Sequence, residues 1–352
     1  MKTRVHNALV LLACLVGAAC GQEPAILADD DPTTVNLSLE VALADDPDSY
    51  AAPTGDHEKM QTLRIVVVRP DGTVEANRYI EITDAVIRYG YETFEVVARE
   101  EKRIYLFANE NDTRLVDDGS PVADAWEFFR AIRPGQKFPA ERIAGLTVEL
   151  DGGSEQLVGP LPMNECHTVQ VGAEDKEESL FVTRAAVKFT FRIVNRSTER
   201  RQLTGLAIEK MAPREYYLPR NAVYDADRAI VSYDTPTLAD DDFYRFTLAA
   251  DALPVDLPPA GDDASAPAIA ELDPIYLLEG KYADPDDTRN YRIALSLDGY
   301  DGLLTGYLDN LPALPRNTHA VINVTVGAGS ELSCTVDVVP YGEVVLEPDF
   351  GI

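Results

Sequence analysis

The chain has 352 residues, with 31 Lys and Arg against 60 Asp and Glu, and its formal net charge is −29. Apolar residues make up 45% and charged residues 26%, a composition typical of a folded protein rather than a disordered acidic chain. The length allows two domains of ordinary size. So negative a chain excludes a nucleic-acid-binding protein, because few cations remain to neutralise phosphates.

The N-terminus has the pattern of an export signal. Lys2 and Arg4 precede an apolar run over residues 8–19, which is too short to span a bilayer but matches a signal peptide. Small residues lead into Cys20, and this resembles the lipobox of bacterial lipoproteins, whose cysteine is acylated after cleavage. We therefore expect a signal peptide over residues 1–19 and lipid on Cys20. Two alternatives stay open: acylation at Cys14, which fits the box better by letter but leaves an apolar run of about five residues, and plain secretion.

The exported part is predicted to begin with a tether and to continue as two domains. Residues 20–33 are acidic and read as a flexible tether, which the lipid would hold on a membrane. The charged stretch Gly172–Ser179 is the best candidate for a domain boundary. The predicted domains are therefore residues 34–175 and 176–352.

Alternation of apolar and polar residues is the dominant pattern, and it predicts strands. Residues 63–68 and 103–108 are instead continuous apolar runs, which indicates strands covered on both faces. A turn signal, Pro70-Asp71-Gly72, follows the first of these runs. Many short strands without a strand–helix–strand rhythm indicate an all-β protein built of sandwiches. The alternating apolar positions of the first strand are Val35, Leu37, Leu39, Val41 and Leu43, and further strands are predicted over residues 187–193, 291–297, 322–326 and 332–338.

One helix is predicted in the first domain, over residues 121–133. Val122, Ala125, Trp126, Phe129 and Ile132 recur at helical spacing, and the pattern stops at Pro134-Gly135. We interpret this stripe as core packing of a helix laid over a sheet rather than as a ligand site.

The sequence offers no catalytic or metal-binding constellation. None of the common nucleotide, hydrolase or metal motifs is present, and no two histidines have ligand spacing. We therefore expect no enzymatic activity, no metal and no cofactor. Beyond the predicted lipid-bearing Cys20, the exported part contains Cys166 and Cys334; a disulfide between them is the alternative to free thiols in an exported protein.

Several segments together resemble the fimbrillin family, the subunits of Bacteroidales type V pili. The segments are residues 63–74 with 102–111, residues 161–165 with 181–193, and residues 314–326 with 339–351. They follow one another in the family's order over nearly the whole exported chain. The resemblance implies two tandem transthyretin-like β-sandwich domains, a lipoprotein precursor in the outer membrane, and a place in a cell-surface fimbrium that supports adhesion.

The resemblance also implies assembly by donor-strand exchange, in which a protease removes the first strand and the next subunit supplies a replacement. The removable strand would be residues 34–43, and the cut would fall in residues 44–60, whose one basic residue is Lys59. The best-known members are cut after Arg, which this loop lacks. The donor would lie within residues 332–352, where the pocket-filling side chains would be Leu332, Cys334, Val336, Val338, Val344 and Leu346.

Three functions follow as alternatives. The first is a fimbrial subunit whose partners are other fimbrial subunits and the outer membrane. The second is a surface lipoprotein that does not polymerise, either a pilus anchor or accessory subunit or an adhesin for glycans or other ligands on host or bacterial surfaces. An exported hydrolase ranks last, because no nucleophile and base are paired in the sequence.

Overall fold

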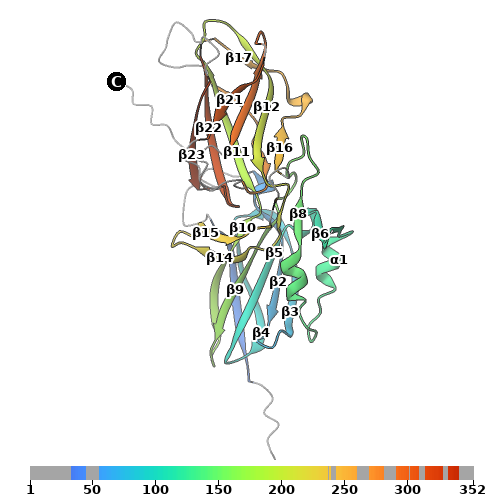
Figure 1. Ribbon diagram of the computed structural model, residues 1–352. Helices are drawn as coiled ribbons and strands as arrows, with labels where there is room; N and C mark the ends of the chain where they lie inside the picture. Colours follow the sequence, from blue (N-terminus) through green and yellow to red (C-terminus); the bar gives the residue numbers. More distant parts are fainter. Residues whose placement is uncertain are drawn as a thin grey trace, which may run out of the picture.

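The computed structural model describes residues 33–44, 55–236, 238, 243–259, 269–280, 291–300, 302–308, 314–327 and, for their backbone, 332–340. Strands dominate the described residues, and the predicted all-β class is confirmed. The described helices are the short α1 (Ala125–Arg130) and α2 (Ala140–Gly145) and the 3₁₀ turns η1 (Asp56–Glu58), η2 (Glu110–Asp112) and η3 (Ala250–Ala252). Figure 1 shows two stacked units, here called the first unit (residues 33–184) and the second unit (from residue 185 on).

The first unit is a seven-stranded sheet in the order β3-β2-β5-β9-β10-β1-β4. The two outermost strands of this order follow one another in the sequence and touch, since Arg78 of β3 pairs with Glu92 of β4. The sheet therefore curls round an inner core. Its strands are β1 (Thr34–Leu43), β2 (Met60–Val68), β3 (Val74–Val86), β4 (Arg88–Val97), β5 (Glu100–Ala108), β9 (Met163–Val171) and β10 (Lys176–Arg184).

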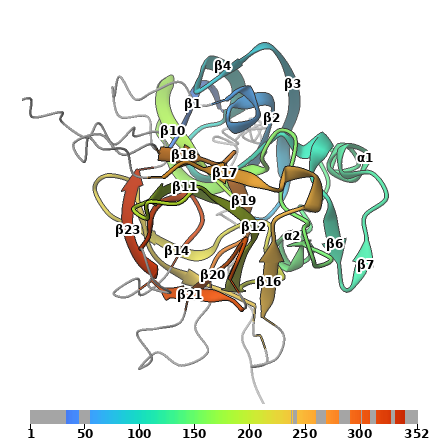
Figure 2. The same ribbon diagram turned by 90° about the horizontal axis from the view of Figure 1, so that it is seen from above.

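The second unit is a sandwich of two five-stranded sheets, which face each other when seen from above (Figure 2). One sheet has the order β18-β11-β22-β23, with β19 also on β11; the other has the order β16-β12-β20-β21, with β17 also on β12. The first sheet consists of β11 (Val187–Asn195), β18 (Ile269–Glu271), β19 (Ile275–Leu277), β22 (Thr318–Val326) and β23 (Leu332–Pro340), and the second of β12 (Arg201–Met211), β16 (Tyr244–Thr247), β17 (Val255–Leu257), β20 (Arg292–Leu297) and β21 (Leu304–Tyr307).

Two small sheets lie where the units meet. In one, a strand of the second unit, β13, extends a sheet of the first unit in the order β13-β8-β6-β7; the other is the hairpin of β14 and β15. The strands are β6 (Leu115–Asp117), β7 (Ser120–Pro121), β8 (Thr147–Glu149), β13 (Arg214–Tyr216), β14 (Arg220–Tyr224) and β15 (Ile230–Asp234).

The prediction that β2 and β5 are covered on both faces is confirmed. Leu63, Ile65 and Val67 of β2 point into the inner core of the first unit. Val66 and Val68 point to the opposite face, where they join the same apolar cluster as the residues of α1 and α2. A continuous apolar run is what such a two-sided position requires.

The predicted helix exists but is shorter than residues 121–133. It begins after Asp124, whose carboxylate accepts a hydrogen bond from the Glu127 N–H at 2.9 Å, and it covers Ala125–Arg130. This N-cap satisfies one of the amides that a helix start leaves unpaired. Of the predicted stripe, Ala125, Phe129 and Ile132 are buried, whereas Trp126 is half-buried.

The predicted domain boundary at residues 175 and 176 is wrong by about one strand. Lys176–Arg184 forms β10, which pairs with β1 and β9 inside the first unit. The charged residues that suggested a linker are the solvated beginning of this strand. The chain passes into the second unit at Ala185 and Ala186, both of which are buried.

The two units share an apolar core. Tyr217 of the second unit lies in an aromatic group of the first, with its ring centroid 5.8 Å from that of Phe107 and 6.0 Å from that of Phe129. A buried ion pair lies close by: Arg316 donates from Nε to Glu279 at 2.8 Å and from Nη1 to the Tyr217 carbonyl at 2.9 Å. The contact between the units therefore resembles a protein interior.

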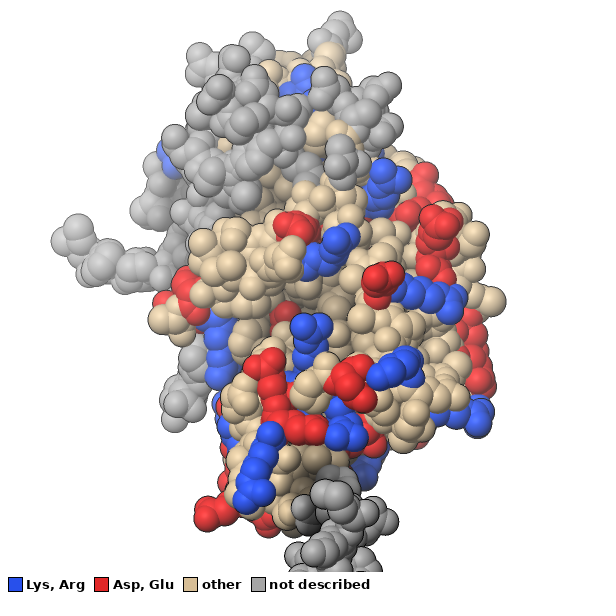
Figure 3. All heavy atoms as spheres, turned by 60° about the horizontal axis from the view of Figure 1, so that its bottom comes forward, with Lys and Arg blue, Asp and Glu red and all other residues tan. Residues whose placement is uncertain are grey.

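Charges of both signs are interspersed on the face of the molecule shown in Figure 3, where blue and red side chains lie next to one another. Ion pairs in the first unit include Arg69 with Glu100 at 2.6 Å and Arg88 with Glu40 at 3.4 Å. The Arg69 side chain, through its hydrogen bond, lowers the pKa of Glu100 to about 2.

Candidate functional site

Strand β1, predicted as the removable strand, is an interior strand of the first sheet. It pairs in parallel with β10, from Leu37 opposite Lys176 to Leu43 opposite Val182, and antiparallel with β4 on its other side. Its removal would therefore expose the backbone donors and acceptors of two neighbouring strands at once. Unpaired strand edges of this kind bind an added strand readily.

The apolar face of β1 fills the inner core, as alternation predicted. Val35, Leu37, Leu39, Val41 and Leu43 are all buried, and the middle three have no exposed area. Filling each such position contributes about 1.5–3 kcal/mol. Without β1, the first unit would have a groove with five apolar subsites between β4 and β10.

Polar groups fix the outer side of the same strand. Asn36 donates from its backbone N–H and from Nδ2 to the Asp175 carboxylate, at 2.8 and 3.1 Å, and these bonds lower the pKa of Asp175. The Ser179 hydroxyl donates to Glu40 at 2.9 Å. These bonds set the register of β1 on β10, because only one alignment brings the pairs together.

The turn η1, which precedes β2, is held by the second unit. Glu58 is 1% exposed, and its carboxylate accepts from the Tyr276 hydroxyl at 2.8 Å and from Lys188 Nζ at 2.8 Å. His57 Nε2 lies 2.9 Å from the same hydroxyl, and Arg184 Nε donates to the Glu58 carbonyl at 2.9 Å. These five residues, here called the η1 clasp, keep the start of β2 in place independently of β1.

Lys59, the candidate cleavage residue, follows the clasp directly. Its carbonyl accepts from Asn109 Nδ2 at 3.0 Å, its N–H donates to the Asp56 carbonyl at 3.2 Å, and its side chain is 22% exposed. Met60, which follows the peptide bond that cleavage after Lys59 would break, has no exposed area. Because proteases cut exposed and flexible segments, this geometry counts against Lys59 as the first cleavage site. Residues 45–54 of the same loop lie outside the described residues.

The candidate donor segment divides into two parts. Leu332, Cys334, Val336 and Val338 belong to β23, which pairs antiparallel with β22 over nine positions at the end of its sheet. Val344 and Leu346 lie outside the described residues, as do Cys20 and the whole of the signal peptide.

The thiol of Cys166 is free. Cys166 lies in β9 opposite Tyr105 of β5, and burial raises its pKa to about 11, so that the thiol stays protonated. Among the described residues, no helix is long and apolar enough to cross a membrane.

Sequence reasoning missed the η1 clasp and the pair of Arg316 with Glu279. The clasp joins Glu58 to Tyr276 and Lys188, which are remote in the sequence and belong to no local pattern. In the sequence, the clasp shows only as a Glu just before an apolar strand, and this does not indicate which residues the Glu contacts.

No protein-family model and no curated protein matches the chain. Solved structures do match over nearly the whole length. A proposed cell adhesion protein from Parabacteroides distasonis is 14% identical with a TM-score of 0.56, covering 90% of this chain and 99% of that chain. A proposed cell adhesion protein from Bacteroides eggerthii is 11% identical with a TM-score of 0.51, covering 88% and 96%. The tip fimbrial protein Mfa3 from Porphyromonas gingivalis, truncated at its C-terminus, is 11% identical with a TM-score of 0.51, covering 87% and 99%.

The chain thus has the fold of Bacteroidales cell adhesion and fimbrial proteins, which agrees with the resemblance seen in the sequence. The proteins that it matches are structural and adhesive rather than enzymatic. At these identities the likeness establishes the fold, and the function rests on the site.

Proposed function

We propose that the chain is a fimbrial subunit of the cell surface, exported as a lipoprotein and assembled by donor-strand exchange. The observation that carries the proposal is the position of β1: an N-terminal strand with five buried apolar side chains and a paired neighbour on each side. Loss of this strand creates a groove that a strand of another subunit restores. The fold shared with a tip fimbrial protein supports the same role.

The donor in this proposal is the C-terminal segment of another subunit. Donation by Leu332–Pro340 would require β23 to leave β22 and to give up nine paired positions. We therefore assign the main donor contacts to Val344 and Leu346 and give β23 a supporting part.

The test uses a recognition site for a sequence-specific protease, inserted between residues 44 and 55. After cleavage, the body should slowly release residues 34–43, and it should then form ladders or bind a peptide of residues 332–352. Release should be slow because β1 is bonded on both sides. Size-exclusion chromatography and fluorescence anisotropy of the labelled peptide measure these steps.

Three controls locate the binding. The uncut protein should not bind the peptide, and a peptide carrying Val344→Asp and Leu346→Asp should bind at least about tenfold more weakly, which corresponds to about 1.4 kcal/mol. A peptide of residues 332–340 alone measures how much β23 contributes to the binding affinity. A cut body that stays monomeric and binds none of these peptides would contradict donor-strand exchange.

A second candidate function is an anchor or accessory subunit that keeps its first strand. The observation in its favour is the cleavage geometry: residues 44–60 contain no Arg, and Lys59 is held by Asn109 and Asp56. Mass spectrometry of the protein extracted from the cell surface separates the two. A mature N-terminus at Cys20 supports the anchor, and one within residues 44–55 supports the polymerising subunit.

Lipid attachment is tested by metabolic labelling with a fatty-acid analogue. We expect the Cys20→Ala protein to incorporate no label and to remain unprocessed or soluble, because the acylated thiol is lost. Cys14→Ala is the matched control and should be labelled normally. Label that persists on Cys20→Ala but not on Cys14→Ala would move the site to Cys14, and an unlabelled wild-type protein would indicate plain secretion.

A further inference from the structure

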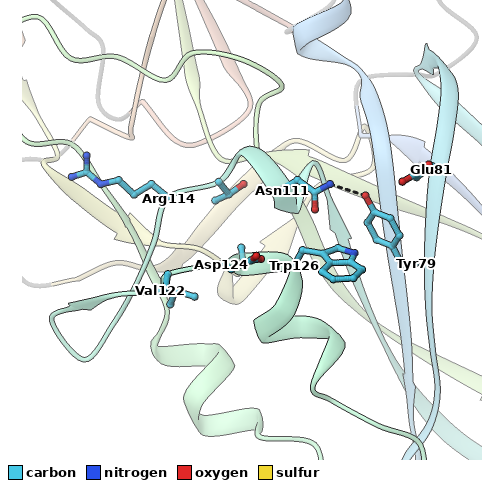
Figure 4. A pocket seen from close by; sticks show the side chains of 10 residues that line it. Tyr79, Glu81, Asn111, Arg114, Val122, Asp124 and Trp126 are labelled. Atoms are coloured by element: carbon cyan, nitrogen blue, oxygen red, sulfur yellow. Dashed lines mark hydrogen bonds between the residues drawn. The ribbon is translucent and has the colours of Figure 1, made fainter.

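The outer face of the first unit contains a pocket of about 790 Å³, open on one side to solvent. Tyr79 and Glu81 of β3 line it together with Asn111, Thr113, Arg114 and residues 122–126 (Figure 4). On β3 these two residues alternate with Ile80 and Ile82, which pack on the inner core. The pocket therefore lies on the opposite face of β3 from the inner core that β1 fills.

Two aromatic rings form a corner of the pocket. The Trp126 and Tyr79 rings meet edge to face, with centroids 6.2 Å apart and an interplanar angle of 82°. Arg130 lies over the Trp126 ring at 4.7 Å and Arg64 over the Tyr79 ring at 5.1 Å. Asn111 Nδ2 donates to the Tyr79 hydroxyl at 2.7 Å. The rings are thus fixed before any ligand arrives, which reduces the entropic cost of binding.

Hydrogen-bonding groups flank this corner on both sides (Figure 4). Glu81 forms no ion pair or side-chain hydrogen bond with the described residues, and the cap bond of Asp124 uses Oδ1. The indole N–H of Trp126 also has no partner among the described residues. Two carboxylates, the Asn111 amide oxygen and the indole N–H can therefore bind hydroxyl groups, mostly as acceptors.

The charges of the pocket narrow the class of ligand. Arg114 points away from the ring corner in Figure 4 and is paired with Asp151 at 2.5 Å and Glu155 at 2.9 Å, so none of the described lining residues offers an unpaired cation to an anionic ligand. A cationic ligand at the ring corner would lie close to the guanidinium groups of Arg64 and Arg130, and like charges repel one another. A neutral ligand rich in hydroxyl groups and with apolar C–H faces fits both the carboxylates and the rings.

We propose that this pocket binds a neutral saccharide. The C–H face of a sugar ring packs on the part of the aromatic corner that the two guanidinium groups leave uncovered, and hydroxyl groups at opposite ends of the ligand donate to Glu81 and Asp124, which flank the two rings (Figure 4). The volume lies within the range of ligand pockets, about 300–1,000 Å³, and leaves room for a short oligosaccharide.

Trp126 is the one tryptophan of the chain, so its fluorescence reports on this pocket directly. The full-length protein is titrated with a panel of neutral probes, namely the methyl glycosides of glucose, galactose and mannose and the oligosaccharides lactose, maltotriose and N-acetyllactosamine. We expect at least one to give a saturable change in emission at millimolar concentration. Sialyllactose and spermine serve as the anionic and cationic probes and should give no saturable change.

Conservative variants locate the binding. Glu81→Gln and Asp124→Asn each remove one charge, and Asn keeps the capping ability of Asp124. Each should weaken binding of the active sugar about tenfold, as should Tyr79→Phe with its lost hydroxyl, while the melting temperature stays unchanged. Glu141→Gln, an exposed residue of α2 that is not among the lining residues, is the matched control and should bind normally.

Three results would overturn the proposal. The first is the absence of a saturable change with every neutral probe, and the second is binding of sialyllactose or spermine in their place. The third is sugar binding that Glu81→Gln, Asp124→Asn and Tyr79→Phe all leave intact, since the sugar would then bind elsewhere.

Discussion

Replacement of Leu39 by aspartate should lower the free energy of unfolding of the uncut protein by at least about 4 kcal/mol. Leu39 has no exposed area, and truncation of such a residue alone costs about 2–5 kcal/mol. The new carboxylate would also be buried without a partner. In the sheet register it would lie opposite Glu92 of β4 and Glu178 of β10, so like charges would face one another.

Urea denaturation followed by circular dichroism measures this loss, and Leu39→Met is the matched control. A volume-conserving change should cost less than about 1.5 kcal/mol. The same substitution also tests the groove: a peptide of residues 34–43 should rebind to a cut body freed of β1, and the peptide with Leu39→Asp should not. Equal stabilities of Leu39→Asp and the wild type would mean that β1 does not fill the core.

Much of the fold could be predicted from the sequence because the burial pattern of a strand depends on a few consecutive residues. The alternation of β1 and the continuous apolar runs of β2 and β5 each depend on a few consecutive residues, and the structure buries these residues as expected. The turn after β2 is equally local: Gly72 has a φ of +81°, and its N–H donates to the Arg69 carbonyl at 2.8 Å.

The domain boundary and the length of the helix were predicted wrongly because the residues concerned are compatible with more than one local structure. The acidic residues before Leu180 resemble a linker, yet they begin β10, because a strand with a solvated face can carry the same charges as a loop. The helix was predicted too long because its apolar stripe continues past both ends. Asp124 with Glu127 three residues later is a capping signal that could have placed its start.

The pocket and the η1 clasp could not be predicted, because each joins segments that are distant in the sequence. Trp126 was interpreted as core packing, but Ala125 and Phe129 fill the core and Trp126 lines the pocket with Tyr79. Helical spacing shows which residues share a side of the helix, and the position of β3 decides which of them meet solvent.

Replacement of Arg316 by methionine is expected to lower the free energy of unfolding by about 3–5 kcal/mol. Arg316 and Glu279 are both fully buried, and removal of one partner leaves the other charge unpaired inside the protein. The carbonyl of Tyr217 loses its bond to Nη1 as well, so the contact between the units should weaken.

The double variant with Glu279→Leu should recover at least half of the loss, because an apolar pair leaves no buried charge without a partner. A double-mutant cycle in urea measures the coupling, with Arg88→Met as the control for an exposed pair, which should cost at most about 1 kcal/mol. If the losses of Arg316→Met and Glu279→Leu simply add, the two buried side chains do not stabilise one another.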